Sequence, residues 1–244
     1  HNFDIRKHLL EYDDVLNKHR SAVYTRRVDI LKKGAEATKK GERPLTSLVL
    51  EAVEREIEQT VLFNTAHEES SEWDLEMMAK GFGALFPSGV DVAKTMEGAV
   101  SVADSANDLV GKRTAFIEAF SAKAKEAFKI VEERVADDVV MGEIEKMLLI
   151  RATDDLWIEH LDAITHLRKA MSMQGYGQRD PLVEYKREAY RLYQELLALI
   201  DKQVAHSIFK IQIAAKAVKQ QAESDTRGPA DLTLSGPAKT VDGE

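Results

Sequence analysis

The chain has 244 residues, of which 44% are apolar, enough to bury a hydrophobic core in one large or two small domains. A net charge of −8 argues against a general nucleic-acid-binding protein, and the absence of cysteine excludes disulfides, thiolate metal sites and a thiol nucleophile. Only 13 glycines and 5 prolines accompany abundant Ala, Leu, Glu and Lys, which favours an all-α fold. No apolar run approaches the roughly 20 residues that span a bilayer.

The first part of the chain, residues 1–42, is predicted to be a long helix from Phe3 to about Lys40. Apolar residues recur on one face at spacings of three, four and seven, namely Leu9, Tyr12, Leu16, Val23 and Ile30. The other face is basic and carries Arg6, Lys7, Lys18, Arg20, Arg26 and Arg27. Gly41 and Pro44 end the pattern.

Residues 43–135 are predicted to form a smaller, inserted, acidic helical subdomain. Helical stretches cover 48–62 and 113–135, and a run rich in glycine and proline (81–89) separates them. Within it, Gly111-Lys112-Arg113-Thr114 resembles the end of a phosphate-binding loop. Ala106 occupies the position of the required first glycine and no strand precedes it, so an ordinary helix start is favoured.

Two long amphipathic helices follow within residues 136–220, and they are predicted to form an antiparallel hairpin. The first covers 138–172 and the second covers 181–220. Asp180 is a good N-cap residue for the second helix, and Pro181 suits its first position. From Ala222 onward Ser, Asp, Thr, Gly and Pro dominate, so residues 221–244 are predicted to be a disordered tail.

The first hairpin helix carries a polar cluster, which consists of Asp154, Asp155, Glu159, His160, Asp162 and His166. A carboxylate-bridged metal enzyme would need Glu-x-x-His repeats with partner glutamates, and these are missing. We therefore predict neither a metal site nor a catalytic residue here. The cluster is expected to be a solvated face or to form ion pairs with a neighbouring domain. Trp157 lies on the apolar stripe of the same helix, and we expect it to be buried against the first long helix.

The connection between the two hairpin helices is basic and contains an aromatic residue. From His166 to Arg191 there are six basic and three acidic residues, a local charge of +3. Tyr176 stands between Gly175 and Gly177. It either contacts a partner or an extended chain through its ring, or it folds back onto its own hairpin.

Several of these segments resemble SecA, the bacterial protein-translocation motor family. The resemblance lies in Arg6-Lys7-His8-Leu9-Leu10-Glu11-Tyr12-Asp13-Asp14-Val15-Leu16-Asn17, in Leu156-Trp157-Ile158-Glu159-His160-Leu161, in Gly175-Tyr176-Gly177-Gln178-Arg179-Asp180-Pro181 and in Glu184-Tyr185-Lys186-Arg187-Glu188. The first segment is similar to the start of the long scaffold helix and the others to the two-helix finger. Glu72-Trp73-Asp74 matches the wing domain only loosely.

The resemblance implies a helical scaffold at 1–42 and 136–220, interrupted by a helical wing at 43–135. In the family, ATP and Mg are bound between two helicase-like domains that precede this region. The chain opens on His1 rather than Met, so we expect it to be the C-terminal part of a SecA that does not turn over ATP by itself. The family's Cys/His zinc-binding tail is missing, and we expect no cofactor in this chain.

The resemblance also implies partners and site residues. The finger tip, made of Gly175, Tyr176, Gly177, Gln178 and Arg179, would contact the translocating polypeptide in the mouth of the SecY channel. Arg6, Arg20, Arg26 and Trp157 would couple it to the parent's nucleotide-binding domains. The basic tip suits an anionic membrane surface, and no nucleic acid is expected as a partner. The expected location is the cytoplasm, at the inner face of the plasma membrane.

The alternative is a stand-alone helical scaffold or a chaperone-like binding module with no ATPase parent. It predicts a natural Met start and binding activity without ATP hydrolysis. The coding sequence upstream of His1 distinguishes the two, because only the SecA interpretation requires helicase-like domains with a phosphate loop there.

Overall fold

The computed structural model describes residues 2–40, 43–87, 89–173 and 180–211, without the side chains of 2–9, 36–40, 172 and 173. Every regular element among these residues is helical, so the predicted all-α fold is confirmed. The elements in chain order are α1 (Asn2–Lys40), α2 (Thr46–Asn64), the 3₁₀ turn η1 (Ser70–Glu72), α3 (Leu75–Leu85), α4 (Val92–Asp104), α5 (Leu109–Val135), α6 (Asp138–Met173) and α7 (Pro181–Ile208).

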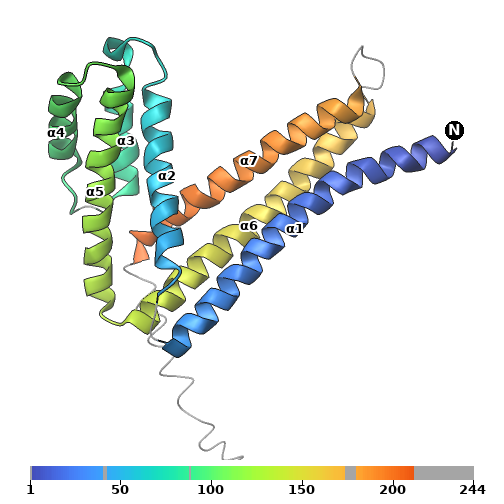
Figure 1. Cartoon of the computed structure of the whole chain (residues 1–244), viewed down its shortest axis with the longest axis horizontal. Helices are drawn as coiled ribbons and strands as arrows, with labels where there is room; N and C mark the ends of the chain where they lie inside the picture. The colour runs from blue at the N-terminus through green and yellow to red at the C-terminus, as the bar shows by residue number, and fades with distance from the viewer. Residues whose placement is uncertain (1, 41–42, 88, 174–179, 212–244) are drawn as a thin grey trace, which may run out of the picture.

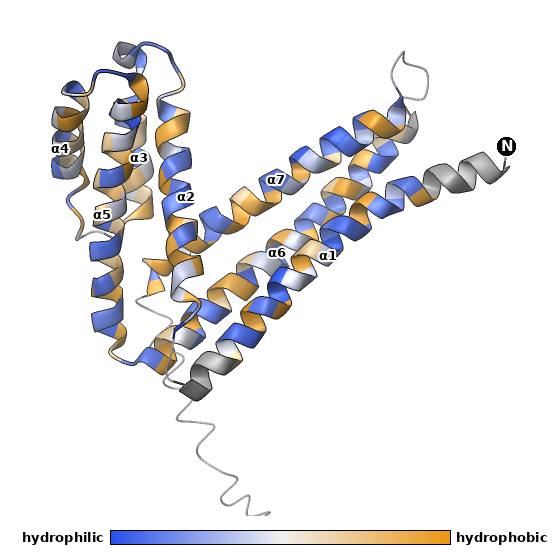
Figure 2. Ribbon diagram, viewed as in Figure 1, coloured by the Kyte–Doolittle hydropathy of each residue, from blue (hydrophilic) through white to orange (hydrophobic). Residues whose placement is uncertain are grey.

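Three long helices, α1, α6 and α7, lie along one another and diverge from the α2–α5 group (Figure 1). α6 and α7 form the predicted antiparallel hairpin, and α1 packs along α6. The 36 residues of α6 span about 54 Å. Hydrophobic and hydrophilic residues alternate along these helices (Figure 2), and the buried residues follow the helical period. Val23 and Ile30 of α1 are both buried, as their spacing predicts.

Aspartate caps define where four of the helices begin. The side chains of Asp74, Asp91, Asp108 and Asp180 accept hydrogen bonds from backbone N–H groups in the first turns of α3, α4, α5 and α7. Each cap satisfies a donor that has no partner inside the helix and places a negative charge at the positive end of the helix dipole. These helix starts are therefore encoded locally.

The α2–α5 group surrounds an aromatic core. The rings of Phe82 and Phe120 stack with centroids 3.6 Å apart, and Phe116 packs edge-on to Trp73. α2 packs against α5 on one side and against α7 on the other. Through α2 the core is continuous with the buried residues of the long helices. The predicted division into 1–42, 43–135 and 136–220 stays a prediction, because no gap in the core marks it.

The predicted break at 81–89 is wrong at its start, since Gly81 and Gly83 lie inside α3. Glycine in a helix interior costs about 1 kcal/mol relative to alanine. Glycine at position 81 eases the packing of α3 on α2, because a Cβ atom there would lie at a tight 3.2 Å from Thr60 Cγ2. Burial of Phe82 and Leu85, which follow Gly81 in α3, offsets this loss of helix stability.

The second hairpin helix also ends earlier than predicted. α7 stops at Ile208 rather than continuing to Gln220, and the turn that follows buries both Phe209 and Ile211. The Phe209 ring lies 5.6 Å from the ring of Phe86, just beyond α3. A continued helix would place these two side chains on different faces, so burial of both favours the turn. The predicted disordered tail, 221–244, lies outside the described residues.

Candidate functional site

The hairpin end nearest the N-terminus of α1 is the predicted contact site for polypeptide. Its central residues, Gly175, Tyr176, Gly177, Gln178 and Arg179, lie outside the described residues. The described flank begins with Asp180, whose carboxylate accepts a hydrogen bond of 2.9 Å from the Leu182 N–H. Pro181 occupies the first helical position, as predicted. α7 therefore starts at a sharply defined residue.

Most of the basic side chains on this part of the hairpin have acidic partners. Ion pairs join Arg168 to Asp13, Arg187 to Glu184 and Arg191 to Glu188. Among the described residues, Lys186 has no hydrogen bond or ion pair and is exposed. The local charge of +3 already counts Glu184 and Glu188, so only Asp13 reduces it further, and the Arg168 pair with Asp13 ties the hairpin to α1.

A second, smaller core holds α1 against this end of the hairpin. Tyr185 is buried, and its ring packs edge-on to Tyr12 with centroids 4.6 Å apart. Ile164 and Ala189 complete the buried cluster. α1 and the hairpin are consequently packed together close to the predicted contact site, and not only at the central crossing.

At the central crossing, two buried histidines meet between α1 and α6. His19 Nδ1 lies 3.1 Å from His160 Nε2, and the His19 ring stacks on Tyr193 of α7. Trp157 adjoins His160 with ring centroids 5.5 Å apart. The expectation that His160 belongs to a solvated polar face is wrong, because its ring is turned into the contact between the three long helices.

Burial, reinforced by the neighbouring His19, lowers the pKa of His160 to about 4. Burial lowers the pKa of His19 as well. Neutral imidazoles suit the observed contact, because one ring nitrogen donates its N–H and the other accepts it. A second proton would leave two N–H groups facing each other.

We expect the chain to lose stability as the pH falls from about 6.5 towards 4. An unfolded histidine binds a proton near pH ~6.5, whereas folded His160 does so only near pH 4. Between these values the unfolded state binds more protons, so acid favours unfolding, by about 3 kcal/mol for His160. Urea unfolding followed by circular dichroism at several pH values measures this loss.

The matched variants are His160→Gln and His166→Gln, because His166 is exposed on the same helix. The first should flatten the pH dependence between about pH 6.5 and 4, and the second should leave it unchanged. An equally steep dependence in His160→Gln would show that other groups cause the acid sensitivity.

A buried carboxylate joins three helices near the base of the two helix groups. Asp201 of α7 is 7% exposed and accepts hydrogen bonds from Arg55 of α2 at 2.7 Å and from Arg26 of α1 at 3.4 Å. A charged side chain at this depth requires such partners. The Asp201 cluster therefore sets how α2 leaves the long helices.

Arg43 forms a second charged junction, where the chain passes from α1 into α2. Its guanidinium donates to Glu145 of α6 at 2.5 Å and to Glu132 of α5 at 2.6 Å. Glu145 is fully buried and also accepts from Thr46. Burial raises the pKa of the Glu145 carboxyl although Arg43 opposes this shift. Arg43 Nε and Glu145 Oε2 are buried without a hydrogen-bond partner, so this junction is incompletely satisfied.

The four predicted coupling residues have different environments. Trp157 is buried, as expected, and packs edge-on to Tyr24 of α1. Arg20 is exposed and donates only to Asn17, one turn away, at 3.1 Å. Arg26 is engaged within the chain by Asp201. Arg6 lies in α1, and its side chain is not described. Their role in coupling stays a prediction.

Sequence reasoning missed the charged junctions at Asp201 and Glu145. Their partners are distant in sequence, and no local pattern pairs Arg43 with Glu145 or Arg55 with Asp201. The local pattern does not single out the buried carboxylates, because Glu143 also adjoins Ile144 and its side chain is 41% exposed.

The remaining polar motifs have structural partners. Asp154 accepts two hydrogen bonds from Arg27 of α1, so part of the predicted cluster links helices of this chain. Arg113 donates to the Thr65 carbonyl, and Lys112 donates to Ser70. These contacts fasten the start of α5 to the loop after α2. Within the described part of the chain, no group of three or more His, Asp or Glu side chains is placed to hold a metal.

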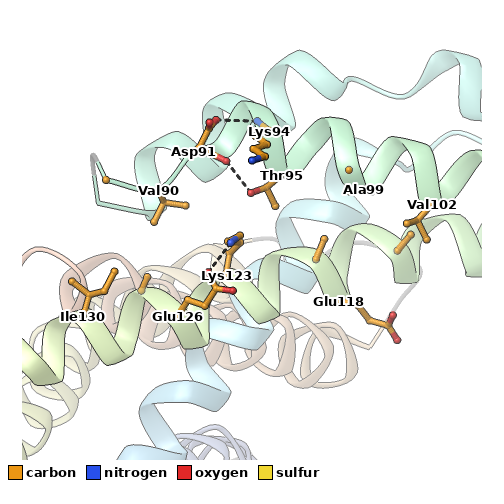
Figure 3. Close-up of a pocket in the computed structure, with 15 residues that line it drawn as sticks. Val90, Asp91, Lys94, Thr95, Ala99, Val102, Glu118, Lys123, Glu126 and Ile130 are labelled. Carbon is orange, nitrogen blue, oxygen red and sulfur yellow. Dashed lines mark hydrogen bonds and ion pairs between the residues drawn. The ribbon is translucent and has the colours of Figure 1, made fainter.

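Two larger grooves lie on either side of α2 and α5. One, of about 770 Å³, runs between α4 and α5, where Ala99 and Val102 form part of its lining and Glu118 stands at its rim (Figure 3). Lys123 and Glu126 pair across its edge. The other, of about 760 Å³, lies between α2 and α7 beside the Asp201 cluster.

Comparison with known proteins identifies the family to which this chain belongs. The family model of the SecA wing and scaffold domain matches residues 1–212, which include all the described helices. The chain belongs to the SecA family. This confirms the resemblance found in the sequence and assigns the chain to a protein translocase family.

Similar SecA proteins come from several bacteria and share the name protein translocase subunit SecA. The Thermodesulfovibrio yellowstonii protein is 33% identical over 213 residues, covering 87% of this chain and 21% of its own length. The Pelotomaculum thermopropionicum protein is 34% identical, and the match covers 91% of this chain and 23% of the relative. The Geobacter metallireducens protein is 32% identical, and the match covers 96% of this chain and 24% of the relative. The chain thus spans about a quarter or less of these relatives.

No helix among the described residues combines the length and the apolar character that crossing a bilayer requires.

Proposed function

We propose that this chain is the scaffold and wing part of an ATP-driven protein translocase, and that it couples ATPase domains outside the sequence to movement of preproteins through the SecY channel. The observation that carries the proposal is the SecA wing and scaffold match over residues 1–212. By itself the chain is expected to have no ATPase activity, and ATP and Mg belong to the parent's other domains.

The packing of the long helices supports a mechanical role. α1 packs against α6, and the two cores on either side of the His19 crossing, which use α1 residues between Tyr12 and Ile30, hold it against the hairpin. A displacement of α1 is therefore transmitted to the hairpin rather than absorbed by bending. Helices packed side by side are stiff because their interiors are close-packed.

α1 also offers a surface for the parent's nucleotide-binding domains. Tyr24, Val28 and Leu31 lie at helical spacing on one side of α1 and are between 38% and 51% exposed. The relatives are more than four times longer than the matched segment, so most of each relative lies outside it. An apolar row of this kind is typical of a surface covered by another domain. Arg20 would extend this contact with a charge.

The other partners follow from the same proposal. The hairpin connection, including Tyr176, would contact the preprotein and the SecY channel at the inner face of the bacterial plasma membrane. The exposed Lys186 near that end suits an anionic lipid surface. The protein would work in the cytoplasm as a peripheral membrane component.

Tyr176 provides the test of this proposal. In the intact translocase, Tyr176→Ala should reduce precursor transport several-fold and leave ATP binding and folding stability unchanged, to within about 0.5 kcal/mol. Tyr176→Phe should retain most transport, because the contact area of the ring rather than its hydroxyl carries the effect. Transport into membrane vesicles and the urea midpoint are measured on the same variants.

Phe63→Ala is the matched control, since Phe63 is an aromatic residue in the last turn of α2 and is 80% exposed. It should affect neither transport nor stability. Normal transport by Tyr176→Ala would refute polypeptide contact at this residue. A fall in stability that matches the loss of transport would instead favour a Tyr176 folded back onto its hairpin.

A further inference from the structure

Two separate apolar clusters hold α1 against the hairpin, which projects away from the α2–α5 group (Figure 1). Val23 of α1 and Trp157 of α6 belong to the main core. Ile164 of α6 and Tyr185 of α7 belong to the smaller core, against which Tyr12 of α1 packs. The three long helices therefore contribute to both clusters.

The polar contact between His19 and His160 separates the smaller core from the main core. Along α1 this contact lies between Tyr12 of the smaller core and Val23 of the main core, and the order along α6 is the same. Folded proteins open locally in cooperative units that follow such divisions in packing. The smaller core can therefore be disrupted while the main core stays packed.

Tyr185 is the buried residue of α7 that lies closest to the hairpin connection. It is 1% exposed, and no described side chain from Asp180 to Glu184 is buried. On α6 the corresponding residue is Ile164. The ring of Tyr185 packs edge-on to Tyr12 with centroids 4.6 Å apart, and its hydroxyl lies 3.5 Å from the Tyr12 carbonyl oxygen. The position of the hairpin end relative to α1 thus depends on this ring.

An ion pair beside Tyr185 forms a second link between the hairpin end and α1. Arg168 of α6 donates to Asp13 of α1 at 3.2 Å, and both side chains are about half exposed. Burial raises the pKa of the Tyr185 hydroxyl and the charge of Arg168 opposes this shift, so the guanidinium lies close to the ring. Because an ion pair this exposed contributes little to stability, its main effect is to orient the hairpin end.

Without these contacts the hairpin end would be a free arm. About 20 Å of α6 extends from His160 to Met173. Crossing angles of packed helices vary by about 15–20°, which would move the end of such an arm by roughly 5–7 Å. This displacement is as large as one helical turn, about 5.4 Å. A movement of α1 of similar size would then be lost before it reached the hairpin connection.

We propose that Tyr185 and Arg168 are positioning residues, which fix the hairpin end to the first half of α1 so that the hairpin connection follows each movement of α1. This rests on the proposed function in one respect, namely that α1 drives the hairpin. It assigns this transmission to the smaller core, whereas Trp157 and the main core fix the middle of the hairpin and its attachment to the α2–α5 group.

Distances between spin labels test the positioning in the whole chain. The sequence has no cysteine, so introduced cysteines carry the only labels. One pair is placed at Leu10 and Val183, which are exposed on α1 and α7 beside the smaller core. The other pair is placed at Val28 and Leu199, which are exposed on the same two helices beside the main core. Double electron–electron resonance gives the distance distribution for each pair.

Tyr185→Ala should broaden the distribution between positions 10 and 183, because loss of the ring releases the arm. The distribution between positions 28 and 199 should stay narrow, because the main core remains packed. Tyr190→Ala is the matched control, since Tyr190 lies on the same helix and is 63% exposed. It should leave both distributions narrow.

The amount of precursor transported per ATP hydrolysed tests the role in the intact translocase. Tyr185→Ala should lower this ratio several-fold, whereas a loss of folded protein alone would lower transport and hydrolysis equally and leave the ratio unchanged. Arg168→Asp should lower the ratio about twofold to fivefold, in line with the strength of an exposed ion pair. The double variant Asp13→Arg, Arg168→Asp should restore it, because the pair forms again with its charges exchanged.

Three results would each overturn the inference: a narrow distribution between positions 10 and 183 in Tyr185→Ala, an unchanged ratio in Tyr185→Ala, or failure of the exchanged pair to restore the ratio. Tyr176→Ala distinguishes these from failure of the proposed function. If the hairpin has no part in transport, Tyr176→Ala and Tyr185→Ala both keep the unmodified ratio. If Tyr176→Ala impairs transport and Tyr185→Ala does not, only the positioning inference fails.

Discussion

Replacing Trp157 by alanine should lower the free energy of unfolding by about 3–5 kcal/mol, the range for removal of a large buried aromatic side chain. Trp157 is 7% exposed and lies in the main core, where it packs against Tyr24 of α1 and beside His160. Its removal leaves a cavity between α1 and α6 that these rings cannot fill without moving. Urea unfolding followed by circular dichroism measures the loss.

Ile158→Ala is the matched control, because Ile158 follows Trp157 on α6 and is 62% exposed. It should change stability by no more than about 0.5 kcal/mol. If the two variants were equally stable, the packing of α1 on α6 at this point would be wrong. The comparison therefore separates loss of the core from any general intolerance of α6 to substitution.

Arg43→Met should destabilise the chain by about 3–5 kcal/mol at neutral pH. The substitution leaves Glu145 fully buried without the guanidinium that hydrogen bonds to it at 2.5 Å, and Thr46 is then the remaining hydrogen-bond donor to its carboxylate. The pKa of this carboxyl is already raised by burial, and loss of Arg43 should raise it further. The folded variant then binds a proton more readily than the unfolded one, so the penalty should shrink as the pH falls.

Removal of both charges provides the control. Replacing a buried ion pair by apolar residues of similar size is often neutral or stabilising. Arg43→Met, Glu145→Leu should therefore be more stable than Arg43→Met alone. A double variant that is less stable than the single one would show that Glu145 contributes through contacts other than Arg43, and the pair would not be a unit.

The long helices and their starts were accessible from the sequence because they depend on neighbours within about four residues. The spacing of Val23 and Ile30 indicates which side of α1 is buried, and Asp180 with Pro181 indicates where α7 begins. The burial of Trp157 followed from its place on the same kind of stripe. The SecA motifs supplied the family, which the comparison over residues 1–212 confirmed.

The errors arose where a distant contact outweighed a local preference. Gly81 favours a helix break, but α3 continues through it because Met78, Phe82 and Leu85 are buried on one face of the helix. The period of α7 favours a longer helix, but the turn at Phe209 gains contact with Phe86. The continuation of α3 and the end of α7 both depend on residues in other helices, which are distant in the sequence.

By itself, the sequence determined that this is an all-α protein of the SecA family with three long amphipathic helices, because periodicity and caps are local properties. Only the tertiary structure decided which polar groups are buried and with whom. Only once the helices have packed does His19 contact His160, Asp201 accept hydrogen bonds from Arg26 and Arg55, and Arg43 donate to Glu145. The physical reason is that desolvation and ion pairing act through space. Whether a charged side chain is solvated or buried with a partner therefore depends on the helices that pack against its own helix.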